Sequence, residues 1–159
     1  MKKLSILFLI MALGVTGIVF GQFTEQLSDT ATLGLSGTVP QYVEITINAN
    51  GAGTGLDLTQ EETTAFEVAT VTESGNTPYT VSANSPTGFT LQHETETGYA
   101  VTYTLFYGGV NVESNVGAVS TGTFGSATTK SITMTHGAVS TSDPSGTYSD
   151  TITFTISAD

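Results

Sequence analysis

The stretch VTYTLFYGGVNVES, residues 101–114, decides the fold class of this chain. Its first half holds four apolar residues spaced two apart, which share one face of an extended strand: Val101, Tyr103, Leu105 and Tyr107. Gly108 and Gly109 follow, and two consecutive glycines suit the positive φ angles of a type I′ turn. Val110 and Val112 then resume the alternation, so the stretch predicts a β-hairpin.

The same period-two pattern recurs on both sides of the hairpin. Alternating segments cover residues 33–39, 43–47, 66–74, 79–83, 89–91 and 132–134. The composition agrees, because the chain has 31 threonines, which favour strands, and 18 glycines, which favour turns. About eight short strands with turns between them predict an antiparallel, immunoglobulin-like β-sandwich.

A last strand closes the sequence, with its apolar residues at Tyr148, Ile152, Phe154 and Ile156. We expect the Tyr148 hydroxyl to bond back to the chain across a corner of the sandwich. The core should be filled largely by six aromatic residues: Phe66, Phe89, Tyr103, Phe124, Tyr148 and Phe154.

The amino terminus reads as a secretion signal. Lys2 and Lys3 precede an apolar run that is short for a membrane span, and small residues suit cleavage after Gly21. An uncleaved anchor is the alternative. We therefore expect a signal peptide over 1–21, an amino-terminal extension over 22–40 and one sandwich domain over 41–159, secreted through the periplasm to the cell surface.

Charge limits the possible partners. The chain has 14 acidic and 3 basic residues, a net charge of −11, and Lys130 is the only basic residue outside the signal. Such an acidic protein is not expected to bind nucleic acid or an anionic membrane. The absence of cysteine excludes disulfides, thiolate metal sites and cysteine nucleophiles.

No constellation of residues indicates an enzyme, a cofactor or a metal site. His93 and His136 lack partners at zinc-ligand spacing and are interpreted as surface histidines. Asp57, Glu61 and Glu62 do not match a calcium loop, so a solvated acidic loop is favoured over a weak calcium site. Lys130 is interpreted as a solubilising charge at a sheet edge, with an isopeptide bond as the minor alternative.

Three stretches of the sequence resemble bacterial fimbrial subunits, or pilins. They are TATLGLSGTVPQYVEITINANG from Thr30, the hairpin, and GTYSDTITFTISAD from Gly146. The first is similar to the mature amino terminus of colonisation-factor-type major subunits of the alternate chaperone–usher class, and the other two also resemble the spore coat U domain family. The lack of cysteine departs from that family and from classical pilins, and agrees with the colonisation-factor type.

The resemblance implies assembly by strand donation, in which an amino-terminal extension fills the groove of an incomplete neighbouring sandwich. The donor would be residues 28–39, with Leu33, Leu35 and Val39 in successive pockets and Gly37 allowing close approach. Its partners would be further copies of the chain, a periplasmic chaperone and an usher. Two alternatives remain: the same residues could form the first strand of a self-complete monomer, or the protein could be a monomeric adhesion module that binds sugar or calcium.

Overall fold

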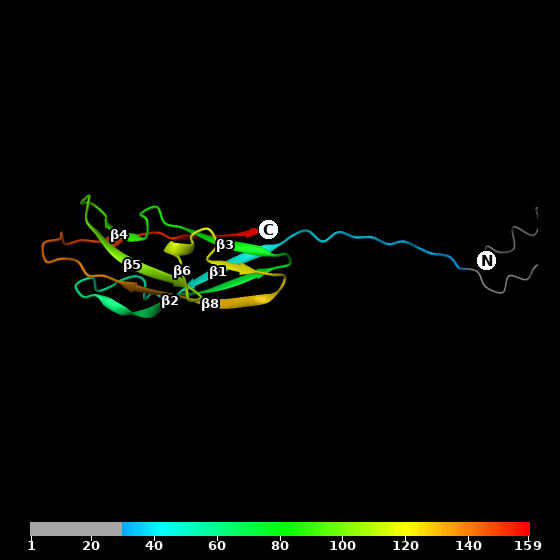
Figure 1. Cartoon of the computed structure of the whole chain (residues 1–159), viewed down its shortest axis with the longest axis horizontal. Helices are drawn as coiled ribbons and strands as arrows, with labels where there is room; N and C mark the ends of the chain where they lie inside the picture. The colour runs from blue at the N-terminus through cyan, green and yellow to red at the C-terminus, as the bar shows by residue number, and fades with distance from the viewer. Residues whose placement is uncertain (1–29) are drawn as a thin grey trace, which may run out of the picture. The chain divides into compact units, whose positions relative to one another are not determined.

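The structure is a computed structural model that describes residues 30–159. The expected signal peptide, residues 1–21, and the extension up to Asp29 lie outside the described residues. The chain divides after Gly37, and the second unit, Thr38–Asp159, holds every strand of the described residues. Figure 1 shows this unit as two packed layers of strands.

The larger layer has the strand order β1-β2-β8-β5-β4-β9, and β6 pairs with β5. Its strands are β1 (Val43–Ala49), β2 (Glu62–Gly75), β4 (Thr90–His93), β5 (Ala100–Tyr107), β6 (Val110–Asn111), β8 (Gly125–His136) and β9 (Tyr148–Ser149). The smaller layer has the order β10-β3-β7, with β3 (Tyr79–Asn84), β7 (Ser120–Gly122) and β10 (Thr153–Ala158). Every pair is antiparallel. The predicted all-β, immunoglobulin-like sandwich is therefore confirmed.

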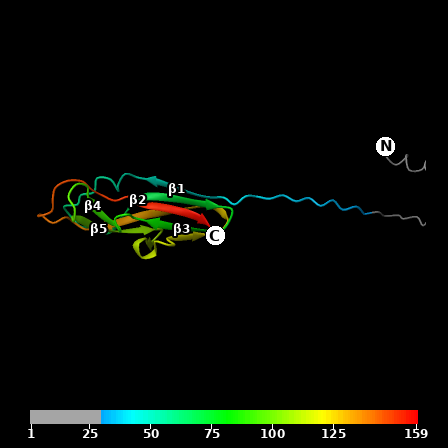
Figure 2. The same cartoon turned by 90° about the horizontal axis from the view of Figure 1, so that it is seen from above.

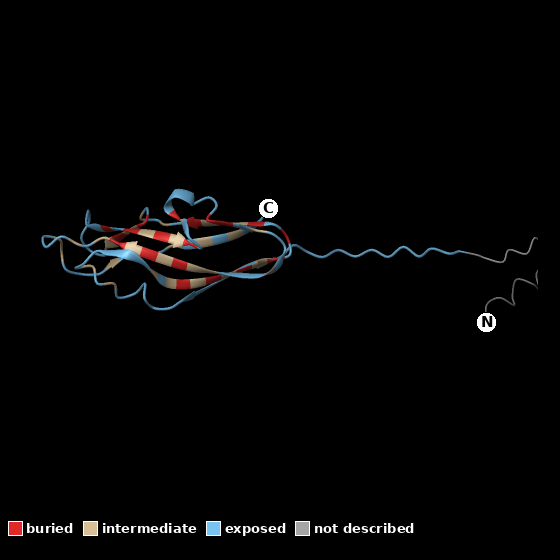
Figure 3. Ribbon diagram, turned by 60° about the horizontal axis from the view of Figure 1, so that its bottom comes forward, coloured by how far each residue is buried: buried red, intermediate tan, exposed pale blue. Residues whose placement is uncertain are grey.

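The core lies between the layers and follows the alternation of the strands, so buried and exposed residues take turns along each strand (Figure 3). The most completely covered apolar side chains come from both layers: Val71, Val81, Tyr107, Val112 and Val119. One 3-10 turn, η1 (Glu113–Asn115), follows β6. The described residues contain no helix that could span a membrane.

The predicted hairpin is confirmed. β5 and β6 pair antiparallel, and Tyr107 lies opposite Val110. The two turn residues, Gly108 and Gly109, have φ angles of 56° and 86°, the left-handed values that their sequence predicts.

The predicted corner is also present, because the Tyr148 hydroxyl donates to the carbonyl of Pro144 at 2.9 Å. However, the single closing strand is wrong. Tyr148 belongs to β9 of the larger sheet, and the chain crosses to the smaller sheet before β10 begins at Thr153. Asp150 fixes the crossing, since its carboxylate accepts hydrogen bonds from the hydroxyls of Ser85 and Tyr103.

The expected aromatic core is only partly correct. Phe89 and Tyr103 are buried, and three of the others pack partly buried against the core: Phe66, Tyr148 and Phe154. Phe124 is 71% exposed, because it lies in the connection between β7 and β8 at one end of the sandwich. The short strand β7 was not predicted, since its three residues, Ser-Thr-Gly, carry no apolar alternation.

Candidate functional site: an open edge of the sandwich

Two strands at one side of the sandwich each have a free edge. Among residues 30–159, β1 pairs only with β2, and β10 pairs only with β3. The two strands approach each other across the layers, and Figure 2 shows both on this side of the molecule. A free edge presents unpaired N–H and C=O groups that can bind another strand. The smaller sheet has only three strands, and a further strand could pair with the unpaired edge of β10.

An apolar groove runs between the two free edges. Its volume is about 240 Å³. It is lined by Ile47, Ala49, Gly51, Gly53, Thr54, Val68, Ala69, Leu105, Ile132, Ile152 and Phe154. Ile47 is 43% exposed although it belongs to the inward-facing register of β1. The groove therefore exposes side chains that a complete sandwich would cover.

Of the residues predicted for the closing strand, Ile152 and Phe154 line this groove. Ile156 packs against the core further along β10, and Tyr148 lines a different cavity near the loop that follows β1. The groove thus receives two of the four predicted residues.

The described part of the extension, from Thr30 onward, has no strand. From Thr30 to Tyr42 the chain has no regular secondary structure, and the first strand begins at Val43. Leu33, Leu35 and Val39 are each at least 80% exposed, and no atom lies within 4 Å of the place where a Cβ would stand on Gly37.

Asn76 fixes the point at which the extension meets β1. Its side chain accepts a hydrogen bond from the Tyr42 N–H at 2.7 Å and donates one to the Pro40 carbonyl at 2.9 Å. Its own N–H donates to the Tyr42 carbonyl at 3.0 Å. By its residue type, Asn76 is expected only to favour a turn. An amide side chain in a turn can bond to passing backbone, but the sequence does not say which segment passes.

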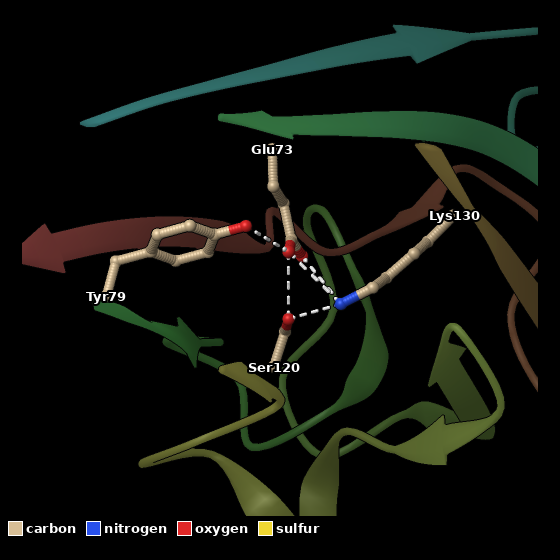
Figure 4. A network of polar contacts seen from close by, with 4 residues as sticks. All are labelled: Glu73, Tyr79, Ser120 and Lys130. Carbon is tan, nitrogen blue, oxygen red and sulfur yellow. Dashed lines mark hydrogen bonds and ion pairs between the residues drawn. The ribbon is translucent and has the colours of Figure 1, made fainter. Parts of the chain in front are cut away.

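Further along β2, toward its end at Gly75, the interior holds a buried polar cluster (Figure 4). Glu73 of β2 is 1% exposed, and its carboxylate accepts hydrogen bonds from the hydroxyls of Tyr79 and Ser120 at 3.2 and 2.9 Å. The Lys130 amine lies 3.1 Å from the same carboxylate and also donates to Ser120. Lys130 therefore is not a charge at a sheet edge: β8 is an inner strand, and the amine points inward.

Opposing effects set the ionisation of Glu73. Burial acts to raise its pKa, but the neighbouring Tyr107, Lys130 and Ser120 hold the pKa below its ordinary value. The Tyr107 hydroxyl is buried beside the cluster without a hydrogen bond of good geometry. An isopeptide bond would require a protonated acid and a neutral amine, whereas this environment favours the ion pair.

Each of the two histidines packs against an aromatic ring of the sandwich. His136 is buried and stacks edge-on against Phe66, so the prediction of a surface residue is wrong for it. His93 is half-buried, its Nδ1 accepts the N–H groups of Thr95 and Glu96, and its ring stacks edge-on against Tyr148.

The acidic loop forms a turn. Asp57 accepts both the N–H and the hydroxyl of Thr59, and these two hydrogen bonds lower the pKa of Asp57. Within residues 30–159, no three carboxylates or histidines gather closely enough to hold a metal ion.

No protein-family model matches the chain, and no curated protein matches it. The groove, the extension and the fold itself are therefore the observations on which a function must rest.

Proposed function

We propose that this protein is a structural subunit of a secreted fimbria or surface filament, in which residues 28–39 of one copy fill the groove between β1 and β10 of the next. The observation that carries the proposal is an apolar groove between two free strand edges, in a chain that also has an exposed, alternating apolar segment. The groove has free strand edges and uncovered apolar side chains, and the segment has the apolar alternation of a strand that could cover them.

The chemistry of the two parts is complementary. A strand in the groove presents alternate side chains to the interior, and Leu33, Leu35 and Val39 stand at even spacings. Each one buried contributes on the order of 1.5–3 kcal/mol. The backbone of the same strand can pair with the free edge of β10, which makes separation of the copies slow.

The proposal also accounts for the expected helper proteins. An open apolar groove beside a free strand edge favours aggregation, so a subunit on its way to the surface needs a temporary cover. A periplasmic chaperone would supply that cover, and an usher would exchange it for the donor of the next copy.

Deletion of residues 22–39 tests the proposal. All strands of residues 30–159 lie after this segment, so the shortened chain should fold, remain soluble with its chaperone and fail to form multimers. Size-exclusion chromatography and a ladder on gels run without boiling would measure the loss. Filaments that persist after the deletion would exclude strand donation. A shortened and a full chain that are both monomeric, with a calcium-dependent rise in melting temperature, would favour the adhesion module instead.

A cysteine pair gives a sharper test, because the native chain has no cysteine to interfere. One copy carries Leu35→Cys and a second carries Ile47→Cys in the groove. Strand donation predicts a disulfide-linked heterodimer after the two are mixed and oxidised. The matched control replaces Ile47→Cys by Val110→Cys, an equally exposed apolar residue on β6 away from the groove. Equal yields from both pairs would contradict donation into this groove.

A further inference from the structure

We infer that each subunit makes a second contact with its neighbour: the end of the sandwich that carries Tyr42 and Phe124 docks on the loop-lined cavity at the opposite end of the next copy. This inference rests on the proposed function and adds to it a docking surface outside the donated strand.

The first surface is the end at which the extension joins β1. Val43 lies opposite Gly75 in one pair of strands, and Gly75 lies opposite Gly125 in the next. Tyr42 and Phe124 directly precede Val43 and Gly125, so they lie at the same end, about 10 Å apart, or two strand spacings. Both side chains are largely exposed, and the end of β10 reaches this end as well, where the Asp159 N–H donates to the Pro78 carbonyl. We call it the exit end.

The second surface lies at the other end of the groove. A cavity of about 430 Å³ there is lined by residues from the loop after β1 and from the segment around β9, including Leu56, Leu58 and Tyr148. Gly53 and Thr54 line both this cavity and the groove, so the two hollows are adjacent. We call it the loop end, and Figure 1 shows these loops at the far side of the sandwich from the carboxyl terminus.

Strand direction determines which ends meet. β10 runs from the loop end at Thr153 toward the exit end at Ala158, where it pairs with Tyr79 of β3. All strand pairs in the molecule are antiparallel, and the open position beside β10 completes an antiparallel sheet. A donor antiparallel to β10 enters with its amino-terminal part at the exit end and leaves with Val39 at the loop end.

The connection between the two copies is short. Tyr42 is held in its own sandwich by Asn76, so only Pro40 and Gln41 separate the donor from the fixed part of its subunit. These residues span on the order of 10 Å when extended. Asn76 also binds the Pro40 carbonyl, which reduces the freedom of this link further. The exit end of the donor copy must therefore touch the loop end of the acceptor.

Charge favours an apolar contact over an ionic one. The sole lysine of the described residues is paired with Glu73 in the interior, so neither end presents a Lys or Arg side chain. The loop end carries Asp57 and Asp143, and an acidic surface cannot form ion pairs with another of the same sign. The cavity itself is lined by Asp150 and several hydroxyl residues as well as by Leu56, Leu58 and Leu91, so uncharged Phe124 and Tyr42 can contact its leucines without adding a like charge.

Mixed cysteine variants test the contact. One copy carries Phe124→Cys and the other Thr54→Cys, an exposed residue at the mouth of the cavity, and a short bismaleimide joins them. The control replaces Phe124→Cys by Val116→Cys, exposed on the loop after η1. Because docked copies hold the thiols at millimolar effective concentration, the test pair should react on the order of a hundredfold faster than the control. The Leu35→Cys and Ile47→Cys pair is run in parallel to report donation.

The outcomes separate the two proposals. Fast reaction of both pairs supports the docking surface. Reaction of the groove pair with a Phe124 pair no faster than its control overturns the docking surface and leaves strand donation standing. Failure of both pairs overturns both. In addition, Phe124→Ser should leave the groove disulfide intact and make filaments more flexible in electron micrographs, whereas Val116→Ser should not. Filaments as stiff as the wild type would contradict the docking role of Phe124.

Discussion

The two edges of the smaller sheet differ in a way that separates stability from assembly. At one edge, the segment that follows η1 covers β3: the N–H of Val119 donates to the Val81 carbonyl, and the N–H of Ala83 donates to the Val116 carbonyl. Val112 and Val119 are fully buried there, and the Glu73 cluster lies beside them. At the other edge, beside β10, an apolar groove leaves Ile47 exposed, although both outer strands, β7 and β10, have an unpaired edge. The apolar interior is therefore buried on one side of the sandwich and partly exposed in the groove on the other.

This difference shows that the open edge is not a consequence of a weak fold. The sandwich has a closed apolar core and a satisfied buried ion pair, so it can tolerate an exposed groove on one side. Changes on the covered side should reduce the free energy of unfolding, and changes on the open side should act mainly on association.

The largest effect is expected from breaking the ion pair on the covered side. Lys130→Met leaves the Glu73 carboxylate buried without its cation, which should lower the free energy of unfolding by about 3 kcal/mol. Urea denaturation of the chain lacking residues 22–39 would measure it.

The control is the double variant Lys130→Met with Glu73→Gln, in which no unpaired charge remains, and most of the stability should return. A single variant as stable as the wild type would mean that the pair contributes nothing, and that the covered side depends on apolar packing alone.

A smaller effect should distinguish a covered position from an open one, by introducing threonine at each of two residues that are paired across β1 and β2. Val71→Thr places a hydroxyl at a fully covered position and should cost about 2 kcal/mol. Ile47→Thr makes a similar change in the open groove, where water can reach the hydroxyl, and should cost less than about 1 kcal/mol in the isolated subunit. Denaturation curves of the two variants measure the difference.

In multimers the effect of Ile47→Thr should be larger, because a donated strand would cover the hydroxyl. The ladder of multimers should then dissociate at lower temperature than that of the wild type. Equal costs for Val71→Thr and Ile47→Thr in the isolated subunit would show that the groove is already closed.

The sequence predicted those features that local patterning determines. Gly108 and Gly109 encode their own turn, and Tyr148 bonds to a carbonyl only four residues away. Period-two alternation was enough to place most strands, because the apolar residues at every second position mark the buried face of a strand.

Features that depend on distant partners could not be predicted. Glu73 shares the inward register of Val71, but its partner Lys130 is 57 positions away, and an isolated acidic residue in a strand gives no sign of it. Phe124 was expected in the core because of its residue type, whereas its position in a connection leaves it exposed. The groove depends on which strand edges stay unpaired, and that becomes visible only when all pairs are known.

The smallest of the expected effects concerns pH and again acts on the covered side. The pKa of Glu73 is below its ordinary value, so its ionised form contributes stability that is fully present above the unfolded-state pKa, about 4.3. That contribution is lost as the pH falls through the lower pKa of the folded state. The groups that face the carboxylate are Lys130, Ser120 and the hydroxyls of Tyr79 and Tyr107, and burial raises the pKa of both tyrosines.

Tyr79 and Tyr107 change the free energy of unfolding at high pH, whereas Glu73 changes it at low pH. Their raised pKa values mean that their contribution is present below pH 10 and is lost at higher pH. The free energy of unfolding should therefore be flat between about pH 5 and 9 and fall at both extremes.

Glu73→Gln should flatten the acid side, as measured by urea denaturation from pH 6 to 3. The open groove has no titrating group in its lining, so strand donation should keep its affinity over the same flat range. An acid-side slope unchanged in Glu73→Gln would assign the acid sensitivity to another carboxylate, with Asp150, whose pKa is also lowered against burial by the hydroxyls of Tyr103 and Ser85, as the next to replace.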